Sequence, residues 1–145
     1  MGTLDYHAMK PQRGLVMLRI IWGAMLAWEG MFAAVMLLVH PAQATGHPAT
    51  GILVCVALAG MAVSIPITYL VRTMILRRAA SKSGDGTVAA TARATASIIF
   101  WSGCEGVCFF ALTCLLITSR VWPFLAIAAV PVTLQVLTFP RSPQA

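Results

Sequence analysis

The sequence contains few charged residues: among its 145 residues there are ten lysines and arginines and only four acidic residues. With 59% hydrophobic and 10% charged residues, the composition is too apolar for an ordinary soluble domain, because a chain of this length would expose much of its apolar surface to water. A lipid bilayer accommodates the same surface without that cost. We therefore expect an integral membrane protein.

Several kinds of chemical site are also missing. The four cysteines lie inside apolar runs, with no CxxC pair and no cysteine–histidine spacing typical of zinc sites. The sequence has no recognisable nucleophile–base pair or phosphate-binding loop, so we expect neither an enzyme nor a cofactor or metal site. The basic residues flank the apolar runs instead of forming a patch with aromatic residues, which favours contact with lipid headgroups over nucleic acid.

Long apolar runs are what the sequence has instead. They are continuous, whereas the strands of a membrane barrel alternate between apolar and polar residues with a period of two. Each is near the ~20 residues that a spanning helix needs. The sequence therefore predicts an all-α membrane protein with four transmembrane helices, at residues 15–39, 51–76, 96–117 and 121–139.

The basic residues mark one side of these helices. Of the ten lysines and arginines, only Arg120 falls in a connection on the other side. The remaining nine lie in or beside the N-terminal segment 1–14, the polar linker 77–95 and the tail 140–145. Because basic residues are retained on the cytoplasmic side of membranes, we expect a multi-pass protein with both termini and the linker in the cytoplasm.

The first apolar run has an alternative interpretation as a cleaved signal peptide. Ala42-Gln43-Ala44 has the form of a signal-peptidase site and follows a basic start and an apolar stretch. However, the run is about twice the usual length of a signal-peptide core and contains Glu29. A retained helix is therefore the favoured interpretation.

The chain has the pattern of an internal duplication. The stretch "AWEGMFAAVMLLV" is echoed by "GCEGVCFFALTCLLI", so that a Glu-Gly pair recurs in register at Glu29-Gly30 and Glu105-Gly106. The stretches "SIPITYLV" and "AVPVTLQV" align in the same way further along. We therefore predict two parallel-repeat helical hairpins, 15–76 and 96–139, related by an axis along the membrane normal.

The two glutamates are the candidate functional residues. An ionised carboxylate at the centre of a bilayer costs roughly 3 kcal/mol on insertion scales. No basic residue lies at that depth, since Arg19 is ~15 Å away along the helix from Glu29. We expect Glu29 and Glu105 to face the bundle interior, either protonated or sharing one proton, and to form a site for a proton or a small cation.

Aligned prolines and glycines are expected to support this site. Pro66 and Pro131 each remove the helical hydrogen bond to the carbonyl four residues earlier, which leaves that carbonyl available to a protonated glutamate. Gly30 and Gly106 are expected to let a neighbouring helix approach closely. Two functions fit this pattern: proton or small-cation binding and translocation, or a non-transporting scaffold or accessory subunit. The expected partners are the lipid bilayer, other membrane subunits or a second copy of the chain.

The second half of the chain resembles a known group of proteins. The segment "TARATASIIFWSGCEGVCFFALTCLLITS", followed by an apolar helix ending in "TFPR", resembles a family of uncharacterised small bacterial four-helix membrane proteins. This resemblance implies a four-helix fold in the bacterial cytoplasmic (inner) membrane. The residues that carry it are Ala96, Ile98, Ile99, Trp101, Glu105 and Gly106.

Each predicted hairpin also resembles, distantly, the c subunit of rotary ATP synthases, in which one helix carries a membrane-embedded carboxylate. The resemblance is confined to that carboxylate. The glutamate lies here on the first helix of each hairpin, and the glycine-rich first helix and polar loop motif of the c subunit are absent. These differences do not favour a rotor role.

Overall fold

A computed structural model describes residues 9–39, 49–81 and 86–140 of the protein. These ranges contain helices and short connections but no strand, which confirms the predicted all-α class. The helices are α1 (Met9–Val39), α2 (Thr50–Ser81), α3 (Gly86–Thr118) and α4 (Val121–Leu137).

Three of the helices are long and apolar enough to cross a membrane. Their spans are Gly14–Val39, Thr50–Ser81 and Val88–Thr118, whereas the apolar α4 is shorter. In the first two spans only 6% of the most apolar window is buried inside the molecule, so large apolar side chains cover the outer surface. Such a surface is unfavourable in water and favourable in lipid, which supports a membrane protein.

The helices α2 and α3 extend into the segment predicted as a polar linker. Residues 77–81 continue α2, and residues 86–95 belong to the beginning of α3, while residues 82–85 lie outside the described ranges. The reason lies in the composition of this segment, which is rich in alanine, the strongest helix former. At the other end of the chain, α4 ends at Leu137 and is two residues shorter than predicted.

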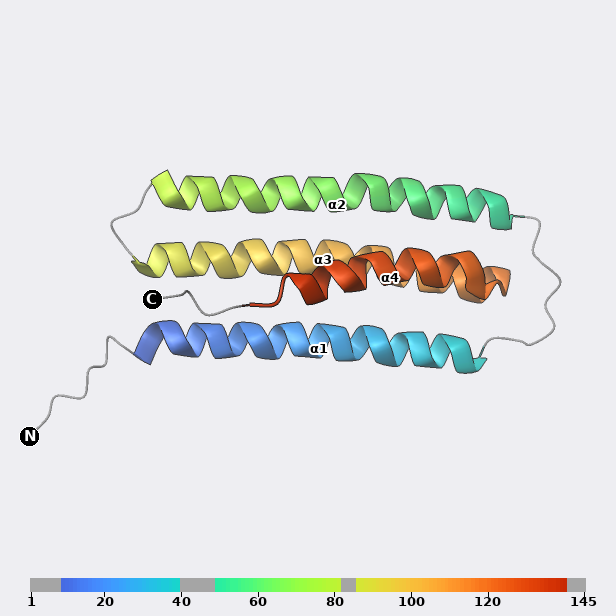
Figure 1. Cartoon of the computed structure of the whole chain (residues 1–145), viewed down its shortest axis with the longest axis horizontal. Helices are drawn as coiled ribbons and strands as arrows, with labels where there is room; N and C mark the ends of the chain where they lie inside the picture. Colours follow the sequence, from blue (N-terminus) through green and yellow to red (C-terminus); the bar gives the residue numbers. More distant parts are fainter. Residues whose placement is uncertain (1–8, 40–48, 82–85, 141–145) are drawn as a thin grey trace, which may run out of the picture.

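The four helices run alternately in opposite directions. Figure 1 shows that α1 and α3 begin at the same end of the bundle and that α2 and α4 run back toward it. This end is called the basic end here, because it carries six of the described arginines. They are Arg13, Arg19, Arg72, Arg77, Arg78 and Arg93, whereas Arg120 precedes α4 at the opposite end.

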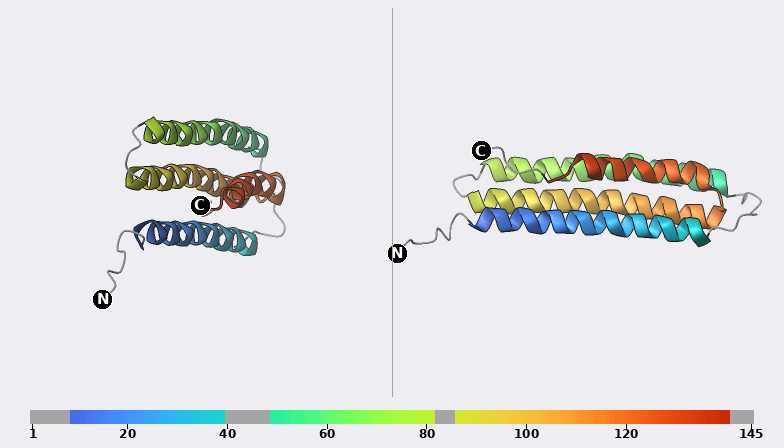
Figure 2. Two further views of the ribbon diagram at one scale, coloured as in Figure 1. Left: turned by 60° about the vertical axis from the view of Figure 1, so that its left-hand side comes forward. Right: turned by 60° about the horizontal axis from the view of Figure 1, so that its bottom comes forward.

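The helix α3 is the central element of the bundle. Figures 1 and 2 show α1 and α2 on opposite sides of α3, with α4 packed alongside it. In agreement with this position, 50% of the most apolar window of α3 is buried. This packing does not confirm the predicted pair of hairpins, since α1 and α2, which would form the first hairpin, are separated by α3.

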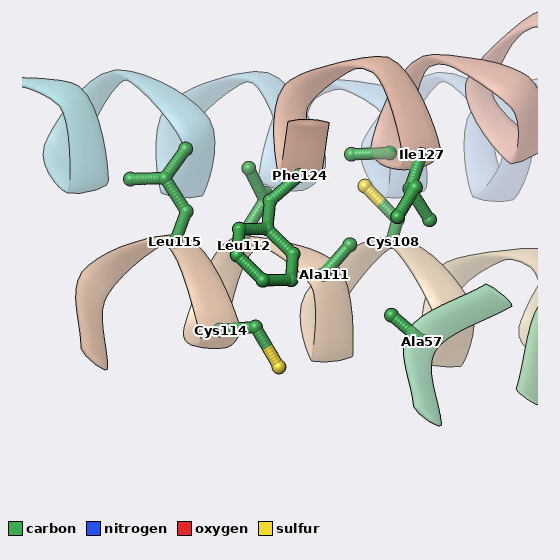
Figure 3. Close-up of a cluster of buried hydrophobic side chains, with 9 residues drawn as sticks. Ala57, Cys108, Ala111, Leu112, Cys114, Leu115, Phe124 and Ile127 are labelled. Atoms are coloured by element: carbon green, nitrogen blue, oxygen red, sulfur yellow. The ribbon is translucent and has the colours of Figure 1, made fainter. Parts of the chain in front are cut away.

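Buried side chains form two clusters at different levels of the bundle. The cluster toward the opposite end, called the apolar cluster here, joins α3 and α4 with a contribution from α2 (Figure 3). The second cluster lies toward the basic end and includes Trp101 and Cys104, with Trp22 packed against it. The apolar cluster consists of Ala57, Cys108, Ala111, Leu112, Cys114, Leu115, Phe124, Ile127 and Ala128.

The helices α2 and α3 approach each other closely at Gly103. A Cβ atom added there would overlap Thr68 Cγ2, and Thr68 is held in place because its Oγ1 donates to the carbonyls of Ser64 and Ile65 at 2.8 and 3.0 Å. We expect Gly103→Ala to destabilise the protein by about 1–3 kcal/mol, measured by unfolding in detergent micelles. Gly106→Ala is the matched control, since its Cβ meets no atom within 4 Å. Equal effects of the two substitutions would show that this contact does not limit helix packing.

Candidate functional site

Glu29 is buried in the middle of the bundle. Its side chain is 2% exposed, and its Oε1 accepts a hydrogen bond of 2.6 Å from Nε2 of Gln135. Gln135 belongs to α4 and is 0% exposed. This contact joins α1 to α4 through two polar side chains inside apolar helices, where a polar group is costly without a partner.

Two tryptophans hold Gln135 in position. Trp22 Nε1 donates to the backbone carbonyl of Gln135 at 3.0 Å, and Gln135 Nε2 lies 3.5 Å from the carbonyl of Trp101. Trp101 Nε1 in turn donates to Oγ1 of Thr138 at 3.0 Å. Through these bonds α1 and α3 fix the last turn of α4, and each indole N–H has the partner that a tryptophan in a core requires.

Two oxygen atoms of the Glu29–Gln135 pair have no partner. Glu29 Oε2 and Gln135 Oε1 are both buried and receive no hydrogen bond from any described residue. Buried polar atoms are rarely left in this state, because each costs about 1–3 kcal/mol. The pair therefore has unused capacity for a proton or another positively charged group.

Glu105 lies near Glu29 but in different surroundings. The two carboxyls are close enough to repel each other if both were ionised, and Glu105, on α3, is only partly buried. Cys104 and Cys108 on α3 are buried free thiols close to Glu29. No group of three or more histidine, cysteine or acidic side chains is arranged to hold a metal ion within the described part of the chain.

The prolines do not supply the hydrogen bond predicted for the glutamates. Pro131 is buried in α4, whereas Pro66 is exposed on α2, on the far side of α3 from α1. The partner of Glu29 is the side chain of Gln135, not a carbonyl freed by either proline.

The glycines beside the glutamates do not have the predicted packing role. Gly30 and Gly106 are exposed, and a Cβ added to either would meet no atom within 4 Å. The prediction was wrong because the face of a helix that carries Glu-Gly turns the glycine outward when the glutamate points inward, since neighbouring residues lie about 100° apart around a helix. The glycine that permits close packing is Gly103.

Gln135 is the residue that the sequence interpretation missed. It is a strongly polar residue within the apolar stretch "PVTLQVL", and a polar side chain inside a spanning segment is an expected marker of a site. The alignment of this stretch with the first half of the chain does not depend on Gln135. A search for uncharged polar residues in the apolar runs would have found it.

Comparison with known proteins does not suggest a function for this site. No protein family, curated protein or solved structure matches the chain. The resemblances described from the sequence therefore stay predictions, and the function has to be inferred from the residues of the site.

Proposed function

We propose that the protein is an integral membrane protein that binds and moves a proton or a small cation through its paired intramembrane glutamates, Glu29 and Glu105. Glu29 is the central residue, Gln135 positions it, and Glu105 is a second carboxyl nearby. The observation that carries the proposal is the pair of buried oxygens without partners, Glu29 Oε2 and Gln135 Oε1. We assign no catalytic residue.

The chemistry of the pair supports reversible binding of a proton. A carboxylate in apolar surroundings without a basic partner is strongly disfavoured, so Glu29 takes up a proton. One oxygen of the neutral acid accepts a hydrogen bond from Gln135 Nε2. When the proton leaves, this bond offsets part of the free-energy cost of a buried negative charge. The nearby Glu105 opposes the simultaneous ionisation of both groups.

Purified protein in vesicles tests this function. Vesicles loaded with a pH-sensitive dye are given a potassium diffusion potential of either sign, and the internal pH is followed. We expect proton movement above that of protein-free vesicles. Absence of movement under both polarities, with sodium or potassium gradients also maintained, would argue against translocation.

The alternative function is a non-transporting scaffold or accessory subunit. It is favoured by the position of the Glu29–Gln135 hydrogen bond, which links α1 to α4. In this function the bond only holds the two helices together and takes no part in ion transfer. The outer faces of α1 and α2 would then pack against other membrane subunits or a second copy. Copurification of a complex, together with no ion movement, would favour this alternative.

We further propose that the basic end faces the cytoplasm of a bacterial cell, with the protein in the cytoplasmic membrane. The asymmetry of the arginines supports this orientation. Single cysteines at Thr45 and Ser83, placed in a background without native cysteines, report it in whole cells. An impermeant thiol reagent is expected to label only the Thr45→Cys protein, and labelling of Ser83→Cys would reverse the orientation.

A further inference from the structure

We propose that Glu29 exchanges its proton with water at the basic end of the bundle, and that the end of α4 forms a closed barrier on that route. The barrier consists of residues 138–140 and the side chains of Arg19, Trp22 and Trp101 that hold them. This inference rests on the proposed function and specifies the side from which the site is reached.

In the conformation described, the route toward the opposite end is closed by the apolar cluster, so a proton that crosses the membrane requires a second arrangement of these helices. Beyond Glu29 in this direction α3 and α4 contribute side chains such as Leu112, Leu115 and Phe124, which Figure 3 shows packed together. The side chains of this cluster have no nitrogen or oxygen atoms. A water molecule inside a protein needs two to four polar partners, so a water-filled path through the cluster is strongly disfavoured.

The route toward the basic end contains a series of hydrogen-bonding groups. From Glu29 it passes to the side chain of Gln135, whose backbone carbonyl accepts a bond from Trp22 Nε1 at 3.0 Å. The hydroxyl of Thr138 follows, and its hydrogen is shared between the carbonyls of Leu134 and Gln135 at 2.8 and 3.2 Å. The same hydroxyl accepts the bond from Trp101 Nε1. These groups supply partners for water at successive positions once the end of α4 moves.

The barrier lies beyond the end of α4 and reaches the surface. Phe139 follows Leu137, the last helical residue, by two positions and is already 37% exposed. Its ring packs edge-on against Trp22 with centroids 4.8 Å apart, and the Arg19 guanidinium lies 5.4 Å from its centroid. Arg19 Nε also donates to the carbonyl of Pro140 at 3.3 Å. For this segment to open, these two ring contacts, the Arg19–Pro140 bond and the Trp101–Thr138 bond have to break.

Proton transfer through this route is balanced by water alone. When residues 138–140 move, a water molecule reaches Glu29 and accepts its proton, and the hydronium leaves through the basic end. The carboxylate keeps the hydrogen bond from Gln135 Nε2 until a proton returns. The titratable groups that lie near Glu29 are Glu105, Cys104 and Cys108, all on α3.

Hydrogen–deuterium exchange of the carboxyl tests the route. Infrared spectroscopy of the protein in vesicles follows the carbonyl stretch of protonated Glu29, identified by its loss in Glu29→Gln, after transfer to deuterated water. Phe139→Ala removes an aromatic pair from the barrier and is expected to speed exchange about three- to tenfold. Arg19→Ala, a surface change that preserves the core, is expected to act in the same direction.

Phe32→Ala is the matched control on the other side of Glu29. Phe32 packs edge-on against Phe109 with the same centroid separation of 4.8 Å, at the level of the apolar cluster. The exchange rate of the Glu29 carboxyl in Phe32→Ala is expected to stay within about twofold of that in the wild type. Faster exchange in Phe32→Ala than in Phe139→Ala, or no effect of Phe139→Ala and Arg19→Ala, would overturn this inference alone. Absence of the Glu29 band in the wild type would overturn the proposed function as well.

Discussion

Glu29→Gln is expected to reduce proton movement by the reconstituted protein to the level of protein-free vesicles while preserving its fold. Glutamine has nearly the same shape as protonated glutamic acid and retains an oxygen that accepts the bond from Gln135 Nε2. It has no proton to release at any accessible pH. The interhelical contact therefore survives, and only the chemistry is lost. Circular dichroism and gel filtration in detergent establish that the variant is folded.

Glu105→Gln is the matched comparison for this result. Glu105 is partly exposed and is not the partner of Gln135, so its substitution removes a repulsive neighbour from Glu29 and leaves the central pair intact. We expect proton movement to persist in Glu105→Gln at an altered rate. A Glu29→Gln protein that moves protons like the wild type would exclude Glu29 as the carrier, and the scaffold function would then stand.

Gln135→Leu is expected to destabilise the protein by about 1–3 kcal/mol, because it leaves the buried Glu29 without its hydrogen bond. Adding Glu29→Leu is expected to restore the free energy of unfolding to the wild-type value or above it, since two apolar side chains of similar volume replace two imperfectly satisfied polar ones. Unfolding in micelles measures both variants.

If Glu29→Leu restores the free energy of unfolding of Gln135→Leu, the polar pair is not needed for stability, as expected of a functional site. Thr133→Val on the same helix serves as control, because Thr133 is exposed and bonds only to the carbonyl of Ala129 in its own helix. Its effect is expected to be within about 0.5 kcal/mol of zero. A double variant that stays well below the wild type in stability would indicate that the pair is retained as interhelical attachment.

The all-helical class and the burial of Glu29 could be predicted from the sequence, whereas the packing of the helices could not. Continuous apolar runs indicate helices, and the cost of an exposed carboxylate in lipid requires Glu29 to face inward. The central position of α3 does not follow from the same reasoning, because all four helices are apolar around most of their circumference. Their apolar faces therefore do not define which helix lies in the middle.

The partner of Glu29 was outside the reach of the repeat-based prediction. That prediction looked for acceptors at Pro66 and Pro131, whereas the contact comes from Gln135, whose position opposite Glu29 depends on how far α4 is shifted along α1. The relative shift of two apolar helices along each other is set by side-chain packing. In a β-hairpin the length of the turn fixes the register of the strands, but the sequence of these helices has no such signal. The helical extension of α3 through residues 86–95 shows a related limit, since a segment that the sequence predicts as a polar linker still forms helix where it is rich in alanine.

The most direct measurement is an infrared titration of the Glu29 carboxyl in vesicles, with Glu29→Gln as reference. If Glu29 binds and releases a proton, the wild type shows the carbonyl band of a protonated acid at neutral pH. The band is absent in Glu29→Gln, exchanges in deuterated water and is lost reversibly as the pH is raised. A band that neither exchanges nor changes with pH until the protein unfolds, or no band at all, would contradict the role of Glu29 as a proton-binding site.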